Sequence, residues 1–144
     1  MKDKKRIILI FMLTVILIIG SILLVISINN KKIYCELDKS NYNSQIYYKL
    51  NENIKINYNH EFIIMDNAVD KYDEINNYLK LINNIDGVET NIEQEQLKLN
   101  YYININLNKI SKDNYELLGI KDLMKNKIKK DIISYYEKNN YSCK

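Results

Sequence analysis

The longest hydrophobic stretch of the chain runs from residue 7 to residue 28. These 22 consecutive residues carry no charge and are dominated by Ile, Leu and Val, with Thr14, Ser21 and Ser27 as polar interruptions. At about 1.5 Å per residue, a helix over this stretch is about 33 Å long, which is enough for the roughly 30 Å hydrocarbon core of a bilayer. The pattern predicts a transmembrane helix over residues 7–28.

Basic residues flank this stretch on both sides. They are Lys2, Lys4, Lys5 and Arg6 before it, and Lys31 and Lys32 after it. Because the short segment before the helix is the more basic one, the positive-inside rule predicts that it stays in the cytoplasm. We therefore expect a cytoplasmic tail over residues 1–6 and an extracytoplasmic domain over residues 29–144.

Two other kinds of N-terminal segment are alternatives to this anchor. A cleaved signal peptide has an apolar region of about 7 to 15 residues and a small-residue cleavage site. The present stretch is longer, but Val25 and Ser27 could serve weakly as small positions, so release of a secreted protein stays open. A lipid anchor is disfavoured, because Cys35 does not directly follow the apolar run.

The region after the anchor begins with strand patterns. Apolar and polar residues alternate from residue 33 to 38, which is the period of a half-buried strand. A second strand is expected over residues 45–50, and a turn at residues 51–53 leads to a third over residues 54–65. The residues expected to share one face of the third strand are Ile54, Ile56, Tyr58, Phe62 and Ile64.

A helical pattern separates these strands from the next pair. Tyr72, Ile75, Leu79 and Ile82 recur at helical spacing between residues 69 and 85, with Asp66 or Asn67 placed to cap the start and Gly87 beyond the end. Alternation resumes weakly over residues 88–94 and clearly over residues 97–107. In that second strand the expected core residues are Leu97, Leu99, Tyr101, Ile103, Ile105 and Leu107, and the expected solvent-facing ones are Lys98, Asn100, Tyr102, Asn104 and Asn106.

The last part of the chain reads as helical. Ser111 can cap a short helical turn that stops near Gly119. An apolar stripe with a spacing of four residues predicts a final helix, and it consists of Ile120, Met124, Ile128, Ile132 and Tyr136. Strands with one solvent-exposed face are typical of an antiparallel sheet. The predicted fold class is therefore α+β, with about five antiparallel strands packed against two helices.

The charge distribution argues against a nucleic-acid partner. The formal net charge is +3, but the residues before position 7 already supply it, and the 17 lysines that remain balance 17 acidic residues. A nucleic-acid-binding domain needs a basic excess on its folded part. The abundance of Asn, Ile, Lys and Tyr indicates an AT-rich, bacterial genome rather than a particular chemistry.

The two cysteines, Cys35 and Cys143, lie near the two ends of the expected domain. Outside the cytoplasm an even number of cysteines is typical of a disulfide, so a Cys35–Cys143 bond is expected; two free thiols are the alternative.

Three short motifs resemble the YehR-like family of small bacterial envelope proteins. They are YCEL at residues 34–37, ELLGI at residues 116–120 and YSC at residues 141–143. The resemblance implies an extracytoplasmic α+β domain of uncharacterised function, and it carries over no catalytic residue. Members of the family are often lipoproteins, whereas this chain lacks a lipidation site.

Few residues are candidates for chemistry. His60 is the single histidine, and no Ser or Cys partner is implied by its spacing, so a partly buried structural role is favoured over a catalytic one. A zinc site is rejected, because two disulfide-bonded cysteines are not available as ligands. A glycosidase needs only two carboxylates beside a groove, and the candidates are Glu61, Asp66, Glu93 and Glu95.

Two surfaces could bind a partner. On the expected final helix, Lys121, Lys125 and Lys129 recur every four residues and are joined by Lys127 and Lys130. These lysines could contact anionic lipid or wall polymer, or could simply form a solvated face. The Tyr and Asn residues of the strands could bind a glycan or a peptide, or could reflect the genome's composition.

The leading hypothesis is a non-enzymatic binding module of the cell envelope, with no catalytic residue, no metal and no cofactor. Its expected partners are the lipid bilayer through residues 7–28 and an envelope protein, peptide or wall polymer. The alternatives are a carboxylate-dependent wall glycosidase and a secreted protein. The sequence leaves the oligomeric state open.

Overall fold

The computed structural model describes residues 2–29, 31–61, 68–125 and 128–144, and the side chains of residues 2–9, 11, 25–29 and 68–70 lie outside the description. The chain divides into two compact units, Met1–Lys31 and Lys32–Lys144.

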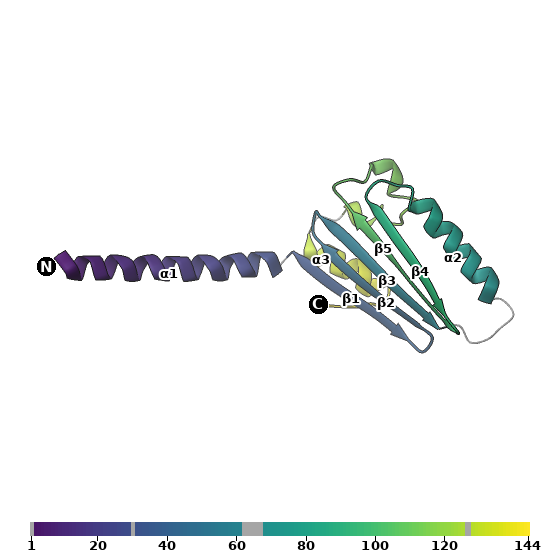
Figure 1. Ribbon diagram of the computed structural model, residues 1–144, viewed down its shortest axis with the longest axis horizontal. Helices are drawn as coiled ribbons and strands as arrows, with labels where there is room; N and C mark the ends of the chain where they lie inside the picture. Colours follow the sequence, from purple (N-terminus) through teal and green to yellow (C-terminus); the bar gives the residue numbers. More distant parts are fainter. Residues whose placement is uncertain (1, 30, 62–67, 126–127) are drawn as a thin grey trace. The chain divides into compact units, whose positions relative to one another are not determined.

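The first unit is a single helix, α1, which runs from Lys2 to Asn29 (Figure 1). Its large apolar side chains between Ile10 and Leu24 are exposed wherever they are described. The hydroxyl of Ser21 donates a hydrogen bond to the carbonyl oxygen of Leu17 at 2.7 Å, so this polar group is satisfied within the helix. Among the described residues, no helix has both the length and the apolarity needed to cross a membrane.

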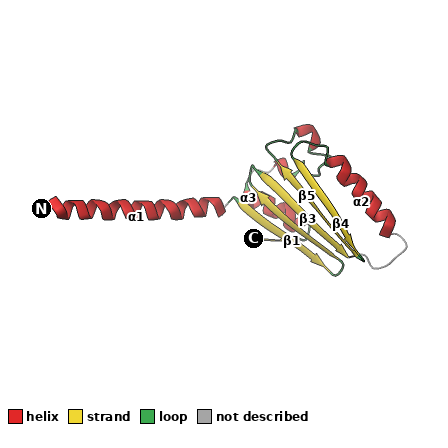
Figure 2. Ribbon diagram, viewed as in Figure 1, coloured by secondary structure: helices red, strands yellow, loops and turns green. Residues whose placement is uncertain are grey.

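The second unit is an antiparallel sheet with two helices, which confirms the α+β class (Figure 2). Its strands are β1 (Lys32–Lys39), β2 (Tyr42–Lys49), β3 (Asn53–Glu61), β4 (Val88–Glu95), β5 (Lys98–Asn106) and β6 (Ser142–Cys143), in the spatial order β4-β5-β3-β2-β1-β6. The helices are α2 (Ala68–Ile82) and α3 (Lys129–Lys138), and two short 3₁₀ turns lie at Lys112–Asn114 and Leu123–Lys125.

Alternation along the strands gives the sheet two different faces. The covered face carries the apolar residues, including Ile33, Ile46, Ile54, Ile103 and Ile105. Leu79 and Ile82 of α2 and Ile132 and Tyr136 of α3 are buried in the same cluster. The opposite side, which we call the open face, carries the polar residues of the strands, and in Figure 1 the sheet lies in front of α3.

Several turns depend on left-handed backbone conformations. Gly119 (φ +67°) ends the short helical segment that follows Ser111, as predicted: the Ile120 N–H bonds to the Tyr115 carbonyl and the Gly119 N–H to the Glu116 carbonyl, which is a Schellman motif. Ser111 occupies the predicted cap position but makes no side-chain capping bond.

The same motif ends α3. Asn140 has φ +67°, the N–H of Tyr141 bonds to the Tyr136 carbonyl at 3.1 Å, and the N–H of Asn140 bonds to the Glu137 carbonyl at 3.0 Å. The rings of Tyr136 and Tyr141 lie 5.5 Å apart, which provides the apolar contact that accompanies the motif. This turn directs the chain from α3 into β6.

The predicted number of strands was one too low. Ser142 and Cys143 form a sixth strand, and Cys143 lies opposite Cys35 of β1. Two backbone hydrogen bonds between Tyr34 and Lys144, at 3.3 and 2.8 Å, extend the pairing. A two-residue strand leaves no alternation to detect, so only its pairing partner reveals it.

The prediction for the final helix was partly wrong. The helix begins at Lys129, and Ile128 before it has an extended backbone and is 65% exposed, so it is not part of a buried stripe. Ile120 and Leu123 are buried, but they reach the core from turns rather than from a continuous helix. Their burial therefore comes from packing of these turns in the hydrophobic core and not from helical spacing.

Strand boundaries also differ from the predicted ones. β2 begins at Tyr42 rather than residue 45, and β5 begins at Lys98, because Gln96 adopts φ +49° in the tight turn after β4. Leu97 is consequently 42% exposed instead of part of the core. Phe62, Ile64, Asp66 and Asn67 lie outside the described residues, so the predicted end of the third strand and the predicted helix cap do as well.

Candidate binding face of the sheet

His60 lies on the covered face of β3 beside Tyr42. The two rings meet edge to face with their centroids 5.3 Å apart, and the histidine is partly buried. Burial, and to a smaller degree the charge of Lys71, lower the pKa of His60. This packed position agrees with the structural role expected from the sequence.

Three of the candidate carboxylates, Glu61, Glu93 and Glu95, lie at one end of the open face. Glu61 and Glu95 both lie opposite Lys98, on either side of β5, whereas Glu93 pairs with Asn100 two residues further along the sheet. Asp66 lies outside the described residues. Among those described, only Glu93 lines the polar depression of the open face.

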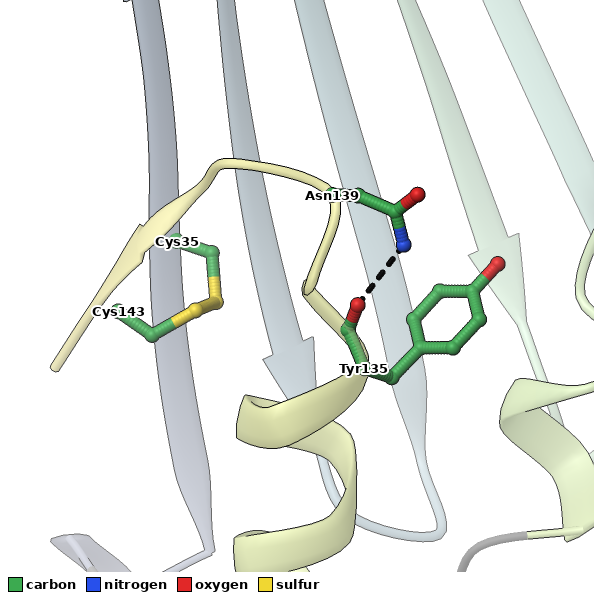
Figure 3. The surroundings of a disulfide bond; sticks show 4 residues. All are labelled: Cys35, Tyr135, Asn139 and Cys143. Carbon is green, nitrogen blue, oxygen red and sulfur yellow. Dashed lines mark hydrogen bonds between the residues drawn. A yellow bond between two sulfur atoms is a disulfide. The ribbon is translucent and has the colours of Figure 1, made fainter. Parts of the chain in front are cut away.

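The cysteines do come together. Cys35 and Cys143 form a disulfide bond between β1 and β6 (Figure 3). Because Tyr34 and Lys144 exchange backbone hydrogen bonds, the neighbouring cysteine pair is a non-hydrogen-bonded pair, in which antiparallel strands approach most closely. The Cα atoms are 4.1 Å apart. The bond ties the two ends of the domain together.

The predicted lysine row is divided. Lys121 and Lys125 precede α3, and their ammonium groups lie 2.9 Å from Glu116 and 2.7 Å from Asp122. The partnership with Glu116 raises the pKa of Lys121. Lys129 and Lys130 lie in the first turn of α3, and Lys127 lies outside the described residues. The expectation of five lysines on one helix was therefore wrong.

The open face contains a depression of about 420 Å³. Its floor is built by two rows of side chains that cross four strands, because pairing register places alternate residues of β4, β5, β3 and β2 side by side. One row is Asn91, Tyr102, Asn57 and Gln45, and the other is Glu93, Asn100, Asn59 and Asn43. Six of these eight side chains are carboxamides.

Some of these carboxamides already have partners. The Gln45 amide donates to Glu36 at 3.2 Å, and the Asn91 amide donates to Glu93 at 2.8 Å. Hydrogen bonds from Gln45, Tyr34 and Asn43 lower the pKa of Glu36. These contacts hold the outer ends of the rows in position.

The centre of the depression is different. Within the described part of the chain, the side-chain amides of Asn57, Asn59 and Asn100 make no hydrogen bond to protein. Each of these groups offers two donors and one acceptor. Three adjacent, unpaired amides on a rigid sheet form a surface suited to hydrogen bonding with a polar ligand.

A second depression, of about 450 Å³, continues the open face. From the open face of the strands, Asn53, Asn104, Asn106 and Glu89 line it, and Glu89 accepts a 3.1 Å hydrogen bond from the Asn104 amide. Its other lining residues are Val88 at the start of β4, residues 83–87 of the segment between α2 and β4, and Lys109. Between the two depressions, the Lys55 ammonium lies 5.7 Å from the centroid of the Tyr102 ring.

The covered face contains two smaller cavities of about 350 and 320 Å³. Both are lined by Ile56, Tyr58, Tyr78 and Leu118. Ile56 and Leu118 belong to the hydrophobic core and Tyr58 packs against it, whereas Tyr78 is 36% exposed. The rings of Tyr58 and Tyr101 stack here with centroids 4.7 Å apart. Burial raises the pKa of both tyrosines. These cavities are gaps in the packing between the sheet and its covering elements.

Comparison with known proteins identifies no family. No protein-family model matches the chain, and no curated protein matches it. Among solved structures, the chain is similar to the NMR structure of a protein from Streptococcus pneumoniae TIGR4, with 11% sequence identity and a TM-score of 0.48, over 78% of this chain and 84% of that one. A likeness this weak says nothing about function.

The sequence pattern predicted only part of the amide-lined depression. The alternation of residues 97–107 correctly indicated that Asn100 and Tyr102 face away from the core. The sequence did not single out Asn57 and Asn59, although their alternation with Ile56 and Tyr58 was a usable signal.

Proposed function

We propose that this chain is a membrane-anchored, non-enzymatic binding module of the cell envelope, whose open face binds a partner outside the cytoplasm. The observation that carries the proposal is the depression of about 420 Å³ with three unpaired carboxamides at its centre. Polar groups that converge in a concave surface without protein partners are typical of a binding site.

The anchor rests on the uninterrupted apolar run over residues 7–28. This run lies within a helix of 28 residues, which is about 42 Å long. Several of its side chains lie outside the described ones, so the support comes from the full sequence together with the helical backbone. The basic residues before position 7 favour a cytoplasmic N-terminus.

An extracytoplasmic location of residues 29–144 agrees with the disulfide between Cys35 and Cys143. Disulfides persist in oxidising compartments and are rare in the cytoplasm.

Binding is favoured over glycoside hydrolysis because the depression has one carboxylate among its described lining residues, Glu93, and that group accepts a hydrogen bond from Asn91. A glycosidase of the usual kind needs a second carboxyl group across the substrate.

Membership of the YehR-like family is also a proposal. It rests on the three short motifs, of which two contribute the cysteines of the disulfide.

Topology can be tested with the full chain carrying a tag after Lys144, expressed in a bacterium with an accessible outer surface. We expect the tag to be digested by protease added to intact cells and the full-length mass to be retained in the membrane fraction. A protected tag would contradict the proposed topology, and a shorter protein in the medium would show that the segment is cleaved.

Occupancy of the open face can be tested without knowing the partner. The described cysteines are both in the disulfide, so a cysteine introduced on the surface is the reactive thiol. We expect Lys55→Cys, between the two depressions, to react with an impermeant maleimide about tenfold more slowly on cells than in purified full chain, as for a site occupied nine-tenths of the time. The matched control is Asn77→Cys, at an exposed position of α2. It should react at the same rate on cells as in the purified chain. Equal rates at both positions would refute the binding role.

A further inference from the structure

We infer that the partner of the open face is a neutral glycan chain that lies along β5 and crosses both depressions. This inference rests on the binding function proposed above and names the chemical class of its ligand.

The first argument is the shape of the surface. Asn100 and Tyr102 line one depression, and Asn104 and Asn106, the next residues of β5 on the same face, line the other. At about 3.3 Å per residue these four side chains cover about 20 Å of strand. Such a track suits an extended polymer better than a compact small molecule.

The second argument is the kind of polar group. On neighbouring β3, Asn53 lines one depression while Asn57 and Asn59 line the other, so amides bound the track on two strands. A carboxamide both donates and accepts hydrogen bonds and carries no charge. It therefore matches sugar hydroxyl and acetamido groups, which have the same dual character.

The third argument is charge. Glu89 and Glu93 stand along the β4 side of the two depressions, and Lys55 lies over the Tyr102 ring between them. The second depression also contains Asp86 and Lys109, whose charges pair with each other at 3.9 Å. Carboxylates beside the track repel a polyanion, so phosphate-rich wall polymers fit it poorly.

The fourth argument concerns peptides. An extended peptide that binds a sheet usually adds to a strand edge and places side chains in apolar pockets. The track lies over the two inner strands β5 and β3, whose edges are already paired with β4 and β2. Tyr102 supplies a ring there, 36% exposed, on which a sugar could lie.

The test uses the Lys55→Cys chain on cells. It measures the protection of this cysteine, which is the factor by which maleimide reacts more slowly on cells than with the purified chain. We expect muramidase digestion of the wall glycan to raise the labelling rate to that of the purified protein, whereas protease treatment of other surface proteins should leave it low. The double substitution Asn57→Ala and Asn100→Ala should reduce the protection from about tenfold to about twofold, as for a tenfold loss of affinity, while Asn77→Ala should leave it unchanged.

The outcomes separate the inference from the function. If protease rather than muramidase relieves the protection, the partner is a protein and the glycan inference is overturned, but the binding function stands. If Lys55→Cys is not protected at all, both are overturned.

A direct measurement complements this. The full chain in nanodiscs should bind the β-1,4-linked tetramer of N-acetylglucosamine in calorimetry, and Asn57→Ala with Asn100→Ala should weaken that binding about tenfold, as expected for the loss of hydrogen bonds to ligand. Unchanged binding in this double variant, with its unfolding temperature also unchanged, would remove the site from the open face. The dimer, which spans less of the track, should bind more weakly than the tetramer; equal affinity would refute the extended mode.

Discussion

The hydroxyl of Tyr141 donates a hydrogen bond to Oγ of Ser44 at 3.0 Å, and it joins residues 97 positions apart in the sequence. Ser44 lies on the covered face of β2 and is 0% exposed. A buried hydroxyl needs a partner, since burial without one costs free energy. The segment after α3 therefore supplies both Cys143 of the disulfide and a partner of this serine, whose hydroxyl also hydrogen-bonds to that of Tyr42.

The pair should show energetic coupling. Tyr141→Phe is expected to lower the free energy of unfolding by about 1 kcal/mol, because it removes one hydrogen bond from a buried hydroxyl. In the background of Ser44→Ala the same change should cost much less. A double-mutant cycle from denaturant unfolding of the full chain in detergent measures this coupling, and strictly additive effects would contradict the interaction.

Reduction of the Cys35–Cys143 disulfide should destabilise the domain. The bond closes a loop across a sequence separation of 108 residues. In the chain-entropy description such a loop contributes about 4.7 kcal/mol, and measured losses are typically about 2–5 kcal/mol. Urea unfolding with and without reductant checks this. The control is the variant with both cysteines changed to Ala, whose stability should not respond to reductant.

Gly87 should tolerate substitution less well than Gly119. Both have positive φ, +86° and +67°, so alanine is strained at either position by about 1–2 kcal/mol. At Gly87 an added Cβ would also lie 2.6 Å from Cβ of Lys109 and 3.2 Å from the Asn106 oxygen, whereas nothing lies within 4 Å at Gly119. We expect Gly87→Ala to lower the unfolding temperature by more than Gly119→Ala. The reverse order would show that the β4 turn is less tightly packed than described.

Stability should fall at alkaline pH. Burial raises the pKa of Tyr42 to about 12 and raises the pKa of Tyr58, Tyr101 and Tyr136 as well. In the unfolded chain these groups ionise near pH 10, so the unfolded state releases protons first and becomes favoured. The contribution of these tyrosines to the free energy of unfolding should be constant below about pH 9 and decline from about pH 10 upward.

Spectrophotometric titration of tyrosinate against pH, followed together with circular dichroism, measures this decline. Tyr101→Phe should reduce its slope, because it removes one of the buried phenol groups whose pKa is raised. Ionisation of every tyrosine near pH 10 with the fold intact would be incompatible with the buried cluster.

Much of the fold could be predicted from alternation and helical spacing. Strands at residues 33–38, 88–94 and 97–107 and the helix at residues 69–85 agree with β1, β4, β5 and α2 to within a few residues. These elements have a period that is visible in their own residues, and burial of one face follows from it. The final helix was misjudged because Ile120 and Ile128 fit the spacing by residue type, although only the first is buried.

The candidate site was less predictable. The polar side of each strand could be recognised, but Asn57 and Asn100 are neighbours only because β3 pairs with β5 rather than with β4. Likewise, His60 and the acidic residues stood out by type, yet the described lining of the depression consists mainly of amides.

The sequence by itself determined what depends on neighbouring residues: the uncharged run over residues 7–28, the strand and helix periods, and the balance of charge beyond the basic segment. Only the tertiary structure decided the strand order, the register that sets amides of β4, β5, β3 and β2 in two rows, and the pairing of β6 with β1. The physical reason is that register is chosen by contacts between distant segments. A shift of one residue would turn the same amides toward the core, and no local pattern encodes that choice.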